Sequence, residues 1–358
     1  MANFTGQLRS NEIFSALYNM IISQHVFADN IAGTNSQLVD MSRVDGGLYG
    51  DTKLYYATDA LKSVPWGDDA EATNLLQTHR PPAPEAQAIT LDTFRQISLT
   101  VDNYLSKRAW SDEGSFSSFN SVLLGWIGDT KRIYDSTTFN AYVGTVSTNV
   151  GKQKVTVDFP QNTGGSTEST NRLQAQAIAE TIANILVDLK DVSRDYNDYE
   201  FIRSYDTEDL VVVWNSEWLN KIKKFDLPTM FHNEGLIDKF GEYVLPAKYF
   251  GTTAGVETVT QGTTRALVEL DLSNGKHVFA GELIPAGANF VSGKMYNTDS
   301  NVICKIMHRR SVPFMSAFEV GTSFFNPKAL NENHYLTWGH NELEYLKNYP
   351  MITVTAAG

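Results

Sequence analysis

A chain of 358 residues can form one large domain or two to three smaller ones, and a hydrophobic fraction of 42% supplies a sizeable core. The 29 Lys and Arg against 41 Asp and Glu give a net charge of −12, which argues against a protein built to grip nucleic acid through clustered cations. The single Cys304 excludes an intrachain disulfide and a cysteine-rich metal cage, and its apolar flanks indicate a small buried side chain.

The first helical pattern begins at Ser10, near the N-terminus. Ile13, Leu17 and Ile21 recur at four-residue steps and would share one apolar face. Residues 33–43 are polar and rich in turn formers, which predicts a linker. We therefore expect the N-terminal helix to bury its apolar face against a neighbouring molecule instead of its own chain.

Two strand patterns then enclose a long polar segment. Residues 54–58 are strand-prone, and residues 67–85 are mostly polar, with three prolines. After them a period-two alternation indicates a half-buried strand, with a break at Phe94 and Arg95 that predicts a bulge or a bend. The alternating residues are Ile89, Leu91, Ile97, Leu99 and Val101. A long excursion without a helix usually marks a binding or functional loop. We predict an extended hairpin.

Two long amphipathic helices follow. Ser115 is placed to cap a helix over residues 115–134, and Gly125 and Gly128 inside it predict close packing against another element. Residues 144–170 are polar, with one short strand at 154–159. Thr170 is then expected to cap a second helix over residues 170–193, because apolar residues recur there at three- and four-residue steps.

The second half of the chain is richer in short strands. Residues 210–214 form a continuous apolar run that predicts a strand buried on both faces, and Asn215 or Ser216 would cap a short helix after it. Asn274 and Gly275 predict a tight hairpin turn. Further strands are expected near residues 302–307, 316–320 and 351–355. The predicted class is α+β.

Residues that could carry chemistry do not form a convincing site. The segment from Gly287 to Lys294 has the wrong spacing for a phosphate loop, and the polar turn at residues 191–200 lacks the register of a calcium loop. The spacing of His334, His340, Glu342 and Glu344 matches no known zinc pattern, so we expect polar residues around a buried Trp338 there. The prediction is therefore a protein that is not an enzyme and holds no cofactor or metal.

Two basic clusters stand out from the acidic background. Residues 221–224 fit the solvated face of a short helix. Lys305, His308, Arg309 and Arg310 fit ordinary surface, a contact with acids of a neighbouring subunit, or a contact with DNA. No signal peptide is recognisable, and no apolar run approaches the roughly 20 residues that span a bilayer, so no membrane association is expected.

The order of these parts resembles the major capsid proteins of tailed bacteriophages, which share the Hong Kong ninety-seven fold. The resemblance rests mainly on the extended loop running into the helix capped at Ser115, and on the apolar strand that ends in Asn215 before Trp218 and Leu219. It implies an N-terminal arm (1–44), an extended β-hairpin loop (45–107) and a peripheral domain (108–205 and 303–358, with the spine helix at 115–134). An axial domain would occupy residues 206–302.

The resemblance also implies a function and partners. Such a protein assembles with itself, as hexamers and pentamers, into an icosahedral virion shell made in the bacterial cytoplasm, and encloses double-stranded DNA without reading its sequence. Some members carry a scaffolding segment before the arm, whereas this chain begins directly with the arm. Either a separate scaffolding protein is used, which the initiator Met1 favours, or the segment has been removed. A portal and a decoration protein are further expected partners. The expected assembly contacts are Ile13, Leu17, Ile21, Trp66, His79, Arg80, Ile89 and Leu91.

Three other interpretations stay open at this point. An encapsulin-like nanocompartment would share the fold but enclose a cargo enzyme. A cytosolic hydrolase could use carboxylates such as Asp195 and Asp198, or His340 with Glu342. Another virion component, such as a tail or portal-adjacent protein, is the third.

Overall fold

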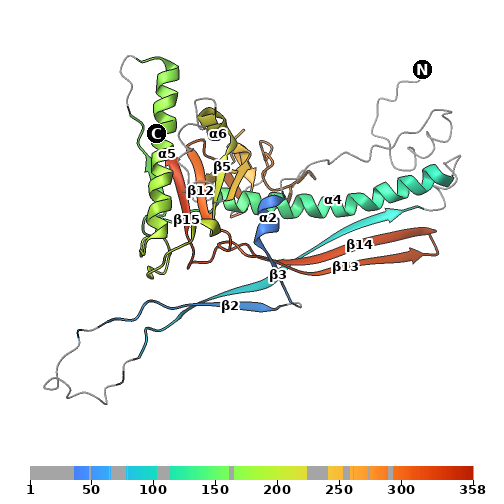
Figure 1. Ribbon diagram of the computed structural model, residues 1–358. Coiled ribbons are helices and arrows are strands. Elements are labelled where there is room, and N and C mark those ends of the chain that lie inside the picture. The colour runs from blue at the N-terminus through green and yellow to red at the C-terminus, as the bar shows by residue number, and fades with distance from the viewer. Residues whose placement is uncertain are drawn as a thin grey trace.

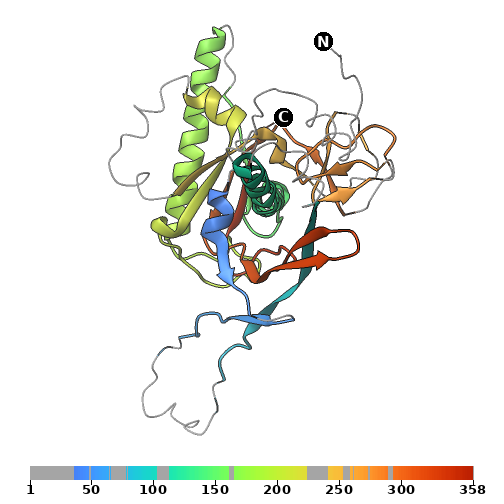
Figure 2. The same ribbon diagram turned by 90° about the vertical axis from the view of Figure 1, so that its right-hand side faces the viewer.

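The computed structural model describes residues 36–47, 50–63, 65, 78, 80–102, 113–160, 165–223, 241–252, 259–260, 262–272, 275–288 and 293–357. Side chains are described within these ranges except for residues 113–120 and 318. Helices and strands are mixed, and a long helix, α4 (Glu113–Thr145), runs beside a set of long strands (Figure 1). Figure 2 shows α5 (Thr167–Lys190) and a strand-rich segment on opposite sides of α4.

The first large sheet has five strands in the order β4-β15-β12-β5-β6. These strands are Lys154–Val157, Met351–Ala356, Val302–His308, Leu210–Asn215 and Gly241–Leu245. Every residue of β5 is buried, as its apolar run predicts, because helices cover both faces of the sheet.

Two apolar clusters account for that burial. On one face, α5 and α6 (Ser216–Lys223) pack on alternate residues of β5 and β12, such as Val212 and Ile306. On the other face, α2 (Gln37–Ser42) and the end of α4 pack on Val211 and Met307. The sheet is therefore the middle of three layers, and Cys304 is fully buried within it, as predicted.

The second large sheet is long and has the order β1-β13-β14-β3-β2. Its strands are Arg43–Asp45, Phe314–Asn326, Asn331–Asn341, Glu85–Val101 and Thr52–Ala57. β13 and β14 form an antiparallel hairpin, and β14 pairs with β3 from Leu91 to Val101. The first part of β3, from Glu85 to Thr90, pairs with β2 instead, so the predicted hairpin exists over six residue pairs.

The helix boundaries differ from the sequence prediction at both long helices. α4 continues past residue 134 to Thr145 because Phe139, Ala141 and Val143 are fully buried against the first sheet. α5 begins three residues earlier than predicted: the Ser166 hydroxyl, and not Thr170, accepts the hydrogen bond from the Ser169 N–H at 3.3 Å.

A smaller strand-rich segment has its own apolar core. It contains β7 (Gly251–Thr252), β8 (Thr264–Ala266), β9 (Leu270–Asp271), β10 (His277–Val278) and β11 (Met295–Thr298). β9 and β10 pair across a turn in which Gly275 has φ +78°, which confirms the predicted hairpin. Two short 3-10 helices, Thr207–Asp209 and Ala247–Tyr249, complete the described elements.

The expected linker over residues 33–43 is wrong for its described part. Residues 37–42 form helix α2, and Leu38 and Val39 are completely buried in the core. β1 follows directly and pairs in parallel with the start of β13. Residues 37–45 are thus anchored to the subunit.

Three further expectations need correction. The bulge in β3 lies at Asp92, where the pairing with β14 shifts register, and not at Phe94 and Arg95. Gly125 and Gly128 have open space where a Cβ would stand, so no described element packs closely on them. Finally, β5 and β12 hydrogen-bond to each other. The boundary expected at residue 302 between the axial and the peripheral domain would therefore divide one sheet.

Candidate assembly surfaces

The hairpin of β2 and β3 carries an exposed apolar face. Leu54 lies opposite Ala88, and Tyr56 lies opposite Ala86; all four side chains point away from the subunit. Leu54 is 55% exposed and Tyr56 is 67% exposed, and Leu61, just beyond the strand, is 73% exposed. The opposite face is bound to the subunit: Gln87 donates to the Tyr345 carbonyl at 3.0 Å and accepts from the Lys347 N–H at 3.0 Å. The hairpin therefore has one side fixed and one side free for contact.

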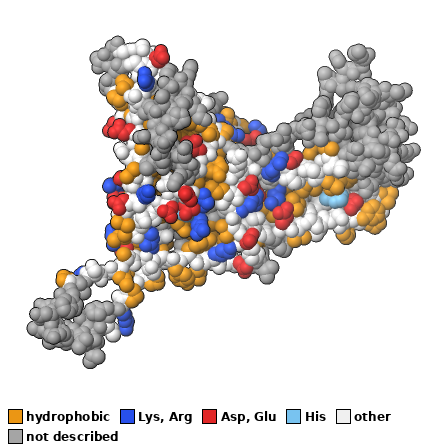
Figure 3. Space-filling model, in the orientation of Figure 1, with side chains coloured by type: hydrophobic (Ala, Val, Ile, Leu, Met, Phe, Trp, Pro, Cys, Tyr) orange, Lys and Arg blue, Asp and Glu red, His pale blue; other side chains and the backbone are white. Residues whose placement is uncertain are grey.

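A second apolar surface lies at the far end of the β13–β14 hairpin. Phe324 is 66% exposed, Phe325 is 52% exposed, and Leu330 in the turn is 44% exposed. Figure 3 shows hydrophobic side chains gathered at this end of the molecule. Phe324 and Phe325 are neighbours in a strand, so they project from opposite faces of the hairpin.

The residues that the sequence analysis expected at contacts are distributed differently. Ile13, Leu17, Ile21, Trp66 and His79 lie outside the described residues. Arg80 is exposed. Ile89 and Leu91 are only 2% and 1% exposed, because their side chains pack inside the subunit with Met315, Ala317 and Leu346. Contact with a neighbour through these two residues is therefore not supported.

Sequence reasoning missed Leu54, Tyr56, Phe324 and Phe325 as exposed apolar residues. Alternation marks the apolar face of a strand but does not say whether the subunit or a neighbour covers it. In β3 the large side chains of Ile89 and Leu91 turned inward, whereas in β2 those of Leu54 and Tyr56 turned outward. β14 was missed altogether because its sequence is polar and contains few strand signals.

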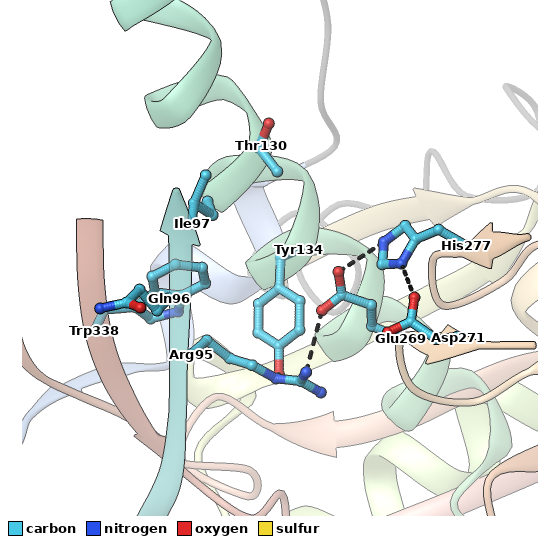
Figure 4. Close-up of a pocket in the computed structure, with 9 residues that line it drawn as sticks. All are labelled: Arg95, Gln96, Ile97, Thr130, Tyr134, Glu269, Asp271, His277 and Trp338. Atoms are coloured by element: carbon cyan, nitrogen blue, oxygen red, sulfur yellow. Dashed lines mark hydrogen bonds and ion pairs between the residues drawn. The ribbon is translucent and has the colours of Figure 1, made fainter. Parts of the chain in front are cut away.

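A polar cavity of about 250 Å³ lies where the strand-rich segment meets α4 and β3. Figure 4 shows Arg95 of β3 between Tyr134 of α4 and Glu269 of the strand-rich segment. The Arg95 guanidinium donates to the Tyr134 hydroxyl at 3.2 Å and forms an ion pair with Glu269 at 3.5 Å. Arg95 thus connects β3 and α4 to the strand-rich segment, and we call this contact between Arg95, Tyr134 and Glu269 the charged joint.

His277 extends this joint. Its Nε2 lies 2.8 Å from Glu269 and its Nδ1 lies 2.8 Å from Asp271, so the ring bridges two carboxylates (Figure 4). The hydrogen bond to Asp271, together with the charge of Glu269, raises the pKa of His277 above its usual value. The protonated ring holds the joint more firmly than the neutral ring.

The basic cluster of Lys305, His308, Arg309 and Arg310 is only half exposed: Arg309 and Arg310 lie at the surface, whereas Lys305 and His308 are buried. Lys305 is 1% exposed, and its ammonium group donates to the Val146 carbonyl at 2.5 Å and to the Thr353 hydroxyl at 2.8 Å. Burial lowers its pKa to about 7. His308 is also buried, and burial lowers its pKa to about 4. Neither side chain is placed to contact DNA.

Two of the polar residues considered for metal binding or hydrolysis, His340 and Asp198, have hydrogen-bond partners within the subunit. The His340 ring bonds the Tyr134 hydroxyl at 2.8 Å and the Asn341 carbonyl at 2.7 Å. Asp198 accepts hydrogen bonds from Thr148, Gln153 and Tyr345. In the described parts of the chain, no three His, Cys, Asp or Glu residues are grouped to hold a metal ion. None of the described helices has the length and apolar character needed to span a membrane.

Comparison with known proteins identifies the architecture. The model of a family described as Phi29-like phage major capsid protein matches residues 4–349. The capsid structure of Staphylococcus phage Andhra is similar with a TM-score of 0.62 and 11% identity, over 95% of this chain and 88% of that chain. A structure of bacteriophage P68, described as head fiber and inner core protein gp22, is similar with a TM-score of 0.60 and 11% identity, over 99% of this chain and 94% of that chain. No curated protein matches the sequence.

Proposed function

Because the chain belongs to the Phi29-like phage major capsid protein family and so forms the shell of a phage virion, we propose that it does so as hexamers and pentamers of itself. The shell would enclose double-stranded DNA without sequence-specific contacts. The net charge of −12 supports this, since an acidic protein does not adhere to packed DNA. The family match supports neither the nanocompartment nor the hydrolase alternative.

The observation that carries the assembly proposal is the exposed face of the β2–β3 hairpin. An isolated two-stranded hairpin is only marginally stable in water, and this one exposes Leu54 and Tyr56 on its free side. Full burial of one such side chain contributes about 2 kcal/mol, and a shell repeats the contact in every subunit. We therefore assign Leu54, Tyr56 and Leu61 to the contact with the adjacent subunit.

Replacing Leu54 and Tyr56 together by Ser tests this assignment. Both side chains are exposed in the subunit, so its free energy of unfolding should change little, while shell assembly should fall strongly. Negative-stain microscopy and sedimentation after co-expression with the scaffolding protein of the same phage would measure shells; urea unfolding would measure the subunit.

Thr90→Ser is the matched control, because Thr90 is exposed on the same hairpin and its hydroxyl bonds that of Thr52 at 3.0 Å. The control should assemble normally. Normal shells from the double variant would remove this face from the assembly contacts.

The N-terminal arm, the extended loop, an axial domain and a peripheral domain remain parts of the proposal, but without the domain boundary at residue 302, which would divide one sheet. So do a scaffolding protein, a portal and a decoration protein as partners. For the arm, Leu17→Asp should impair shell formation without changing the unfolding of the subunit. For the loop, shortening residues 67–85 to a Gly-Ser turn should leave a folded subunit that forms no stable shells.

We also propose that the protein performs no catalysis. The family is structural, and two of the polar residues that could have formed a site, His340 and Asp198, are engaged in hydrogen bonds within the subunit. Replacing His334, His340 or Glu342 by Ala should change stability or assembly alone. Elemental analysis of purified shells showing about one transition metal per subunit would contradict this.

A further inference from the structure

No described strand pairs with the outer edge of β13 along the second half of its length. β1 covers only the beginning of this edge, from Phe314 to Ser316. From Val320 to Asn326 the inner edge pairs with β14, whereas no described strand pairs with the outer edge. Seven residues thus present a row of backbone N–H and C=O groups at the side of a long sheet.

This edge lacks the features that usually protect an edge strand. Natural proteins place charged residues, especially Lys, or Pro on exposed edges to prevent pairing with another chain. Residues 320–326 contain neither a charged residue nor a proline, and residues 320–325 are exposed on both faces of the sheet. The nearest charge in the strand, Glu319, is directed to Lys131 of α4, at 3.2 Å.

We propose that the open edge of β13, from Val320 to Asn326, adds an extended strand of a second copy of this chain, so that the sheet continues across the boundary between subunits. Backbone hydrogen bonds would supply the register, and Phe324 and Phe325 would each cover apolar surface on one face of the joined sheet. This proposal rests on the assembly function above and names a contact that the function alone does not specify.

A second copy is the occupant that the observations favour. The shell is built from copies of this chain, so another copy is always adjacent. The uncharged edge causes no like-charge repulsion between identical subunits, and it offers no charge that would select an acidic or basic partner. The chain also has a strand of suitable length to donate, because β2 forms the opposite edge of the same sheet over six residues.

A pair of proline variants tests the backbone pairing. In an antiparallel pair, successive residues direct their N–H groups alternately to the inner and the outer side. Of Thr322→Pro and Ser323→Pro, one therefore removes a bond to β14 and the other removes only an outward N–H. The outward variant is recognised by an unchanged melting temperature of the free subunit, and it should lose shells or form shells that dissociate at lower temperature.

Side-chain variants separate this contact from simple apolar docking. If Phe324→Ser and Phe325→Ser impair assembly while the outward proline variant forms shells of normal yield and thermal stability, strand addition is overturned. Hydrogen exchange gives an independent measure: about half of the amides in residues 320–326 should exchange at least about tenfold more slowly in shells than in free subunits. Equal exchange, in shells that form normally, overturns the proposal while leaving the assembly function intact.

Cross-linking can determine which chain pairs with the outer edge of β13. Cys304 is the only cysteine and is fully buried, so Ser323→Cys would create one accessible thiol. After labelling of this variant with a maleimide benzophenone, assembly and irradiation, mass spectrometry should find the cross-link on a peptide of another copy of this chain. Isotopic mixing of two subunit preparations distinguishes that copy from the labelled one. A cross-link confined to a scaffolding or decoration protein overturns the assignment.

Discussion

Lys305 makes the stability of the subunit depend on pH in a way that can be calculated. Its ammonium group is buried, with a carbonyl and a hydroxyl as hydrogen-bond partners and no ion pair to any described carboxylate. Desolvation lowers its pKa from 10.5 to about 7. Between these two values the unfolded chain holds a proton that the folded subunit lacks, so the free energy of unfolding rises as pH rises.

The size of the effect follows from the two pKa values. Relative to a side chain that is neutral in both states, Lys305 lowers the free energy of unfolding by about 4 kcal/mol at pH 7, about 3 at pH 8 and about 2 at pH 9. Lys305→Met removes this contribution and also leaves the Val146 carbonyl and the Thr353 hydroxyl without their donor. The loss of these bonds costs about the same at every pH, so the pH dependence of the difference isolates the lysine.

Urea unfolding of wild-type and Lys305→Met subunits at pH 7, 8 and 9 measures this difference. The stability of the variant minus that of the wild type should fall by about 2 kcal/mol from pH 7 to pH 9. Lys294→Met, at an exposed lysine, should show a flat difference over the same range. A flat difference for Lys305→Met would show instead that the buried amine keeps its proton in the folded subunit.

Two further predictions concern a close contact and the charged joint. Gly144→Ala should lower the free energy of unfolding by about 1–3 kcal/mol, because a Cβ there would lie 2.2 Å from the Tyr249 carbonyl oxygen. Gly128→Ala, in open space on the same helix, should raise the free energy of unfolding by up to about 1 kcal/mol. Calorimetry of both variants checks this, and equal effects would contradict it. His277→Asn should destabilise the subunit more at pH 5.5 than at pH 8.5. The raised pKa of His277 means that its charge stabilises the folded subunit below the usual pKa of histidine, and this contribution is lost as pH rises through the pKa of the folded state. If urea unfolding shows a loss of stability that is independent of pH, the charge of His277 does not hold the joint.

The sequence predicted the elements whose pattern is set by local burial. β5 was recognisable because a run of apolar residues of strand length has to be covered on both faces, and α5 because its apolar residues recur with helical spacing. The α+β class and the capsid fold are confirmed by the family match and by the two similar structures. The end of α4 was missed because residues 135–140 are mostly polar, and only their position against the first sheet buries Phe139.

The candidate surfaces were harder to predict because exposure is a property of the whole fold. Ile89 and Leu54 belong to neighbouring strands of one hairpin and have similar side chains, yet one is 2% exposed and the other is 55% exposed. The difference arises because Met315 and Leu346, more than 200 positions away in sequence, cover the face on which Ile89 lies. No periodicity within residues 45–107 contains that information. The proposed contact residues Leu54 and Tyr56 are apolar residues that the returning C-terminal strands leave uncovered, so they could be assigned only after those strands were placed.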